Sequence, residues 1–205
     1  MGADDPAREL DASKLATRFY LALLLACGAY LLFLHGSDGL LDALLDDRSL
    51  RTDLILGLGL GLSLTVASRV LVRVVPAMNR LELELAEAIG PLSAATASKL
   101  AIASGVAEEL LFRGVLQPAL GATAATVLFA AAHLGPSARF GAWALWAGVA
   151  GAAFAIATAH TGNLLAAIVA HVTVNYMGLS WLAARGELRA ASSADSREKS
   201  ALRRG

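Results

Sequence analysis

The sequence has few charged residues, few aromatic residues and a single cysteine in a chain of 205 residues. The lone Cys27 excludes an intramolecular disulfide and is interpreted as a small core- or lipid-facing residue. Basic and acidic residues are equal in number, so the formal net charge is zero. Without a basic field, nothing in the composition favours a nucleic acid as partner.

The chain is rich in apolar residues. They make up 57% of the sequence, and the mean hydropathy is +0.61. This apolar fraction exceeds that of an average soluble domain. Because a crossing needs about 20 apolar residues, we predict an all-α, multi-pass membrane protein of about six transmembrane helices. The six predicted spans, the fourth of them short, are 19–34, 54–75, 92–117, 121–134, 140–159 and 164–184.

Lysine and arginine near the span ends predict the orientation. The loop 35–53 is rich in aspartate, whereas 69–80 and the tail after residue 184 are rich in arginine, so both termini are predicted to be cytoplasmic. No Ala-x-Ala site follows the first span, which favours a retained helix over a cleaved signal peptide. Three regions are predicted. Residues 1–90 form a membrane region with two helices and a cytoplasmic amphipathic segment, residues 91–184 form the core that contains the candidate site residues, and residues 185–205 form a polar, partly disordered tail.

The most informative charges stand inside the third span, in Glu108-Glu109-Leu110-Leu111-Phe112-Arg113. Ionisable groups in a membrane segment are costly and by default mark a functional site. Glu109 and Arg113 are four residues apart and can pair on one helix face. Glu108 lies about 140° from Arg113 at 100° per residue, which leaves it free to act as a general base.

Two histidines and an asparagine lie at a similar depth in later spans. At 1.5 Å per residue, Glu108, His133, His171 and Asn175 all fall about 12 to 18 Å below the same surface. His171 and Asn175 are one helical turn apart and can both donate hydrogen bonds to one substrate oxygen, as an oxyanion site requires. We therefore expect these four side chains to share one site.

Three motifs carry a family resemblance: Glu-Glu-x-x-x-Arg (108–113), Phe-x-x-x-His (129–133) and His-x-x-x-Asn (171–175). In this order they resemble the motifs of the CPBP family, the CAAX-prenyl-protease-2-like intramembrane endopeptidases, also called the Abi family. The resemblance covers roughly residues 91–180. It implies a helix bundle around a polar intramembrane cavity.

By that resemblance, Glu108 would activate water and His133 would assist in proton transfer. His171 and Asn175 would stabilise the oxyanion, and the Glu109–Arg113 pair would hold the helix in place. The implied substrate is a membrane-anchored protein or peptide in the lipid bilayer. The Ala-, Leu- and Arg-rich composition suggests a bacterial inner membrane, which disfavours a prenylated substrate.

A metal site is the main mechanistic alternative. His133, His171 and Glu108 could bind zinc and leave one position open for water. However, the sequence has no His-Glu-x-x-His pair, and a Glu108 ligand would no longer serve as the base. We therefore favour metal-free catalysis, with zinc as the alternative.

Other readings of the same residues also stay open. The charged groups could form a structural ion pair, and the histidines could be helix-packing partners in a non-catalytic scaffold or bacteriocin-immunity protein. A proton-coupled transporter could use the same groups, although we find no paired repeat. Separately, the spacing Gly57-x-x-x-Gly61 is typical of a close helix contact.

Overall fold

The computed structural model describes residues 6–44, 49–89, 92–135, 137–138 and 140–202. All regular secondary structure in these residues is helical, which confirms the predicted all-α class. The elements are α1 (Pro6–Leu44), α2 (Leu50–Val74), α3 (Pro76–Ile89), α4 (Ala94–Glu109), the π-helix η1 (Leu110–Leu116), α5 (Gln117–Leu120), α6 (Ala122–Ala132), α7 (Phe140–Thr161) and α8 (Leu165–Leu202).

Four of the helices are long and apolar enough to cross a membrane: α1, α2, α7 and the first part of α8. The third predicted span, 92–117, is helical but carries the charged cluster. The fourth corresponds to α6, whose 11 residues reach only about 16 Å, against a hydrocarbon core of about 30 Å. The protein is therefore an integral membrane protein, and six is an approximate number of spans.

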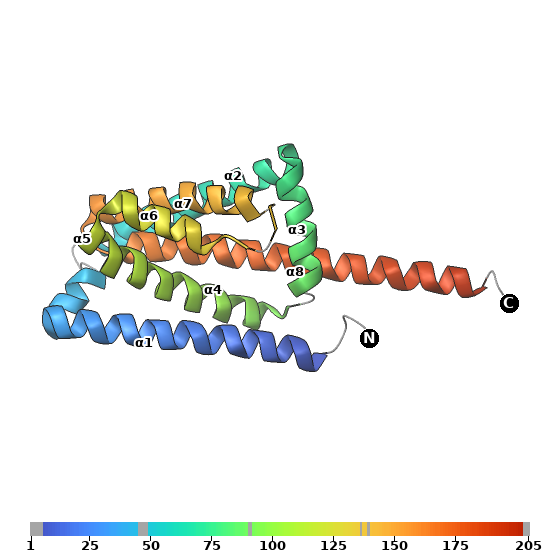
Figure 1. Cartoon of the computed structure of the whole chain (residues 1–205), viewed down its shortest axis with the longest axis horizontal. Helices are drawn as coiled ribbons and strands as arrows, with labels where there is room; N and C mark the ends of the chain where they lie inside the picture. The colour runs from blue at the N-terminus through green and yellow to red at the C-terminus, as the bar shows by residue number, and fades with distance from the viewer. Residues whose placement is uncertain (1–5, 45–48, 90–91, 136, 139, 203–205) are drawn as a thin grey trace.

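Helix α8 runs through the middle of the molecule (Figure 1) and packs against α2, α4, α3 and α7. Helix α1 covers the outside of α4 and η1, and α6 lies against α7. The predicted amphipathic segment is α3, which crosses one end of the bundle. There the buried Glu82 accepts hydrogen bonds from Arg69 and Trp181 and lies 2.9 Å from Arg185, so it fastens α3 to α2 and α8.

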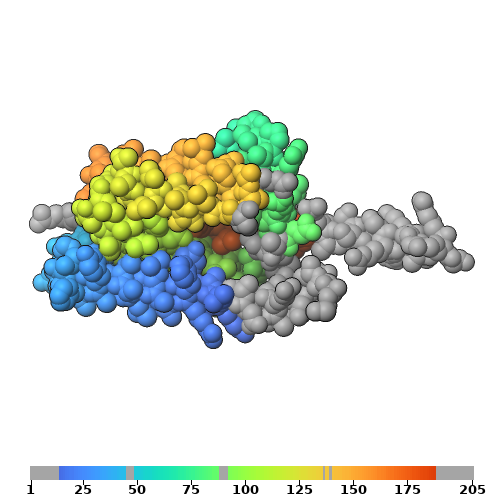
Figure 2. All heavy atoms as spheres, in the orientation of Figure 1, coloured from blue at the N-terminus to red at the C-terminus, as the bar shows by residue number. Residues whose placement is uncertain are grey.

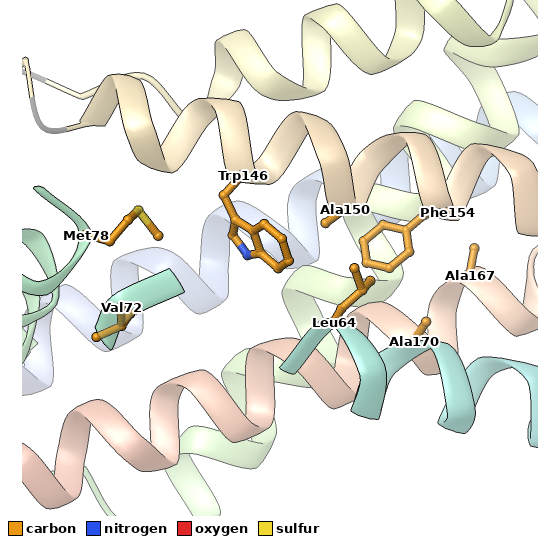
Figure 3. Packing of buried hydrophobic residues seen from close by; sticks show 8 residues of the cluster. All are labelled: Leu64, Val72, Met78, Trp146, Ala150, Phe154, Ala167 and Ala170. Atoms are coloured by element: carbon orange, nitrogen blue, oxygen red, sulfur yellow. The ribbon is translucent and has the colours of Figure 1, made fainter. Parts of the chain in front are cut away.

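The main apolar cluster joins α2, α3, α7 and α8 (Figure 3). Leu64 of α2 and Phe154 of α7 are almost fully buried in it. The alanines Ala167 and Ala170 form the α8 side, and their small side chains let the helices approach closely. This packing fixes the face of α8 that carries His171.

The Gly57-x-x-x-Gly61 spacing forms the predicted close helix contact, and its partner is α8. A Cβ atom on Gly57 would lie 2.6 Å from the carbonyl oxygen of Ala166. On Gly61 it would lie 2.7 Å from the Cβ atom of Thr173 and 2.8 Å from the carbonyl oxygen of Ala170. The two backbones are thus too close for any side chain at either glycine.

The chain after Ala184 differs from the prediction of a partly disordered tail, because α8 continues through it to Leu202 (Figure 1). The segment is polar, but residues 185–202 include four Ala, three Arg, two Glu and one Lys, which favour helix, and no proline. Polarity alone predicted solvation, not secondary structure. The predicted boundary between residues 90 and 91, and residues 203–205, lie outside the described residues.

We expect Gly61→Ala to lower the free energy of unfolding by about 1–3 kcal/mol, because the added methyl group overpacks the α2–α8 contact. Gly59→Ala is the matched control: it lies on the exposed face of the same helix, with no atom within 4 Å of an added Cβ. The control should be neutral or stabilising by about 0.5–1 kcal/mol. Thermal unfolding in detergent measures both, and equal effects would contradict this close contact.

Candidate active site

Glu108 lies in the last turn of α4, directly before the π-helix. Its Oε1 atom accepts a hydrogen bond of 3.0 Å from the hydroxyl of Tyr20 on α1. Its Oε2 atom is buried without a hydrogen-bond partner among the described residues. This free oxygen lies 4.0 Å from Nε2 of His133 and 3.8 Å from Nε2 of His171. Three of the four predicted site residues therefore converge on one point.

His133 directly follows the end of α6 and caps it. Its Nδ1 atom lies 2.8 Å from the carbonyl oxygen of Phe129. Because a carbonyl can only accept a hydrogen bond, Nδ1 must carry the proton. In the neutral ring, Nε2 then presents its lone pair on the side of Glu108.

His171 is held by a carboxylate and by aromatic rings. Its Nδ1 atom lies 2.7 Å from Oε1 of the fully buried Glu109. The imidazole stacks on Phe154 with 5.0 Å between ring centroids and meets the edge of Phe129. Its Nε2 atom is thereby aimed toward Glu108. Glu109 thus contacts a site histidine in addition to the arginine that the sequence predicts as its partner.

Arg113 forms the predicted ion pair with Glu109 at 3.0 Å, and both side chains are almost completely buried. Its second nitrogen donates to the carbonyl oxygen of Gly151 on α7 at 2.7 Å. The guanidinium lies 4.5 Å from the ring centroid of Phe129, a cation–π distance. A Cβ atom on Gly151 would approach a ring carbon of Phe129 to 2.8 Å and that guanidinium to 3.0 Å, so the glycine leaves room for both side chains.

Asn175 lies one turn beyond His171 on α8, and its amide donates to Ser104 Oγ at 2.8 Å. Ser104 is buried one turn before Glu108 on α4. Among the described residues, this is the one hydrogen bond that the Asn175 amide donates, which leaves its second hydrogen for another acceptor. Asn175 is thus beside the cluster of Glu108 and the two histidines.

Two residues at this site were missed by sequence reasoning: Tyr20 and Ser104. Ser104 shares a helix face with Glu108 because it is four residues earlier, and that spacing was a usable signal. Tyr20 lies on α1, 88 residues before Glu108 in the sequence, so no helical spacing relates the two residues. The π-helical conformation of 110–116 was also not predicted, although π-helical turns are frequent at functional sites.

The candidate zinc ligands lie slightly farther apart than the ligand atoms of a tetrahedral zinc site. In a tetrahedral site with ligands at about 2.1 Å, the ligand atoms are about 3.4 Å apart. The two distances from Glu108 Oε2 to the imidazole nitrogens are 3.8 and 4.0 Å. Within the described part of the chain, no group of three or more His, Cys, Asp or Glu side chains has a metal-binding arrangement.

The helices that carry the site residues border a hollow in the surface of the molecule. Figure 2 shows a hollow between α1 and the α6–α7 end of the molecule, and part of α8 is visible in it. The site residues come from these same helices and from α4. The side chains of His133 and Glu108 remain 22% and 14% exposed.

Residues 91–177 match the family model described as type II CAAX prenyl endopeptidase Rce1-like. No curated protein and no solved structure matches the chain. The matched segment contains all three motifs and confirms the resemblance to the CPBP family. It indicates a protease that acts at the membrane. Helices α1 and α2 lie outside it.

We expect Arg113→Met to lower the free energy of unfolding by about 3–5 kcal/mol, because it leaves the Glu109 carboxylate buried without its counter-charge. Arg69→Met makes the same chemical change at a partly exposed ion pair whose acceptor, Glu82, keeps two other partners. The loss there should be about 1 kcal/mol or less. Thermal unfolding of both purified variants tests this order, and the reverse order would contradict it.

Proposed function

We propose that this protein, whose residues 91–177 match the Rce1-like endopeptidase family, is an intramembrane endopeptidase that hydrolyses a peptide bond in a membrane-associated protein. The observation that carries the proposal is the free Oε2 atom of Glu108, which faces the Nε2 atoms of His133 and His171 at 4.0 and 3.8 Å. Polar atoms at such distances are commonly bridged by one water molecule.

In the proposed reaction, Glu108 is the general base. Its Oε2 atom takes a proton from water while the water oxygen forms a bond to the carbonyl carbon of the substrate. His133 Nε2 assists by carrying that proton to the nitrogen of the leaving amine. The carbon–nitrogen bond then breaks, and the products are a carboxylic acid and an amine.

His171 and Asn175 would stabilise the tetrahedral oxyanion. Because Nδ1 of His171 is committed to Glu109, its Nε2 atom can donate only when the ring is an imidazolium, a charge that the Glu109 carboxylate offsets. Asn175 would contribute its second amide hydrogen, with the first held by Ser104. Donors fixed in this way before the reaction stabilise developing charge most effectively.

The substrate would be a membrane-anchored protein or peptide. Large apolar side chains are exposed along α1, α2 and α7, which suits contact with lipid, and the substrate would reach the site from the bilayer.

We further propose a bacterial inner membrane and cytoplasmic termini, on the basis of composition and of the distribution of arginine and lysine. The divisions 1–90, 91–184 and 185–205 remain our hypothesis for the functional regions.

We expect Glu108→Ala to lower cleavage at least 100-fold without changing membrane insertion, since a general base contributes about 10²- to 10⁴-fold. The purified protein in liposomes is incubated with detergent-extracted membrane proteins, and new chain termini are identified by mass spectrometry. Glu187→Ala, at an exposed position of α8, is the control and should cleave like the wild type. Full cleavage by the Glu108 variant would refute its role as base.

Glu109→Ala should affect stability as well as cleavage, because Glu109 contacts both Arg113 and His171. We expect both variants to lower the cleavage rate, but Glu109→Ala should lower the melting temperature much more than Glu108→Ala, which removes only the hydrogen bond from Tyr20. Measuring both quantities for each variant separates them. A Glu109 variant with wild-type melting temperature and cleavage would contradict this role.

The proposed mechanism needs no metal. Cleavage by the reconstituted wild-type protein should therefore survive exhaustive dialysis against EDTA and 1,10-phenanthroline, remaining within about twofold of the untreated sample. Loss of cleavage that added Zn²⁺ restores would instead support the alternative zinc site of His133, His171 and Glu108.

A further inference from the structure

The contact between Tyr20 and Glu108 connects two parts of the chain that are 88 residues apart. Tyr20 lies on α1, outside the segment that matches the endopeptidase family. Its phenol is partly buried, and its hydroxyl donates to Oε1 of the carboxylate at 3.0 Å. A hydrogen bond to a charged acceptor is about twice as strong as one between neutral groups.

Helix α1 is mostly exposed and presents only one narrow face to the protein. Phe19, Leu21 and Leu25 are more than half exposed. By contrast, Cys27 and Leu31 are buried in a cluster with Leu110 and Leu164. Tyr20 precedes Cys27 by seven residues, or two helical turns, and therefore lies on the same face. The packing of α1 thus fixes the height at which the hydroxyl meets Glu108.

The hydroxyl determines which oxygen of Glu108 is free. A carboxylate can turn about its last torsion angle and exchange its two oxygens. With Oε1 bound by Tyr20, Oε2 is the atom that faces His133 and His171 and lacks a partner. Without the hydroxyl, nothing in the described contacts ties Oε1 to α1, and the carboxylate can turn away from the histidines.

We propose that Tyr20 is a positioning residue of the active site, which holds the Glu108 carboxylate so that one oxygen faces the two histidines. The proposal rests on the proposed role of Glu108 as general base. It makes α1 a wall of the catalytic site as well as a membrane anchor. It also extends the functional site beyond residues 91–177.

The test is Tyr20→Phe in the full-length protein in liposomes. The kinetic probe is an internally quenched peptide that spans the bond which the wild-type protein cleaves fastest in the membrane extract. We expect kcat to fall about 10- to 100-fold, the factor for a lost hydrogen bond to a charged group, with KM within about twofold. The control is Tyr30→Phe, the same change on an exposed position of α1, which should leave both constants unchanged.

A second measurement tests the contact without any substrate. Tyr20→Phe should lower the melting temperature of the wild-type protein but not that of a Glu108→Ala background, where the hydroxyl has already lost its acceptor. Equal effects in the two backgrounds would show that Tyr20 acts only through packing of α1. That result would overturn the proposal.

The kinetic outcomes separate the two proposals. If the wild-type protein produces no new termini in the membrane extract, the proposed function fails. If the wild type cleaves, Glu108→Ala does not, and Tyr20→Phe has the wild-type kcat, only the role of Tyr20 is refuted. A rise in KM with unchanged kcat would also refute positioning, since it would indicate substrate binding.

Discussion

The site depends on one buried carboxylate. Oε1 of Glu109 accepts from Arg113 and lies at hydrogen-bond distance from His171, so it joins the start of the π-helix to α8. Through Arg113, the same network reaches the backbone of α7 at Gly151. A charge at a fully buried position is tolerated only when it is paired and hydrogen-bonded. The pairing in turn sets the relative positions of three helices, and these positions decide where Glu108 can point.

The sequence predicted the ionisable residues of the site better than the residues and contacts that hold them in position. Glu108, His133, His171 and the Glu109–Arg113 pair were found because ionisable residues stand out in apolar helices and helical spacing tells which of them share a face. The signals for Tyr20 and Ser104 were weaker. A tyrosine or a serine is common in an apolar helix, and it does not indicate a site until its partner is known. The contact between Glu109 and His171 depends on helix packing, which one sequence does not specify.

The sequence also predicted the positions of the helices better than their ends and their local conformation. Charge and hydropathy located the apolar parts of the long helices α1, α2, α7 and α8, because these are properties of whole segments, but α1 extends beyond the predicted span 19–34 at both ends. They did not reveal that the third span passes into a π-helix at Leu110, since that change depends on one extra residue per turn rather than on composition. The continuation of α8 to Leu202 was missed because a polar sequence with high helix propensity resembles an irregular tail when only polarity is read.

The continuous α8 has a structural consequence. It carries His171 at the site, and Trp181 and Arg185 where α3 is fastened through Glu82, and it runs on to Leu202 without a break. From His171 to Leu202 this is a rod of about 46 Å. One helix therefore links His171, the Glu82 contacts with α3 and the polar segment up to Leu202.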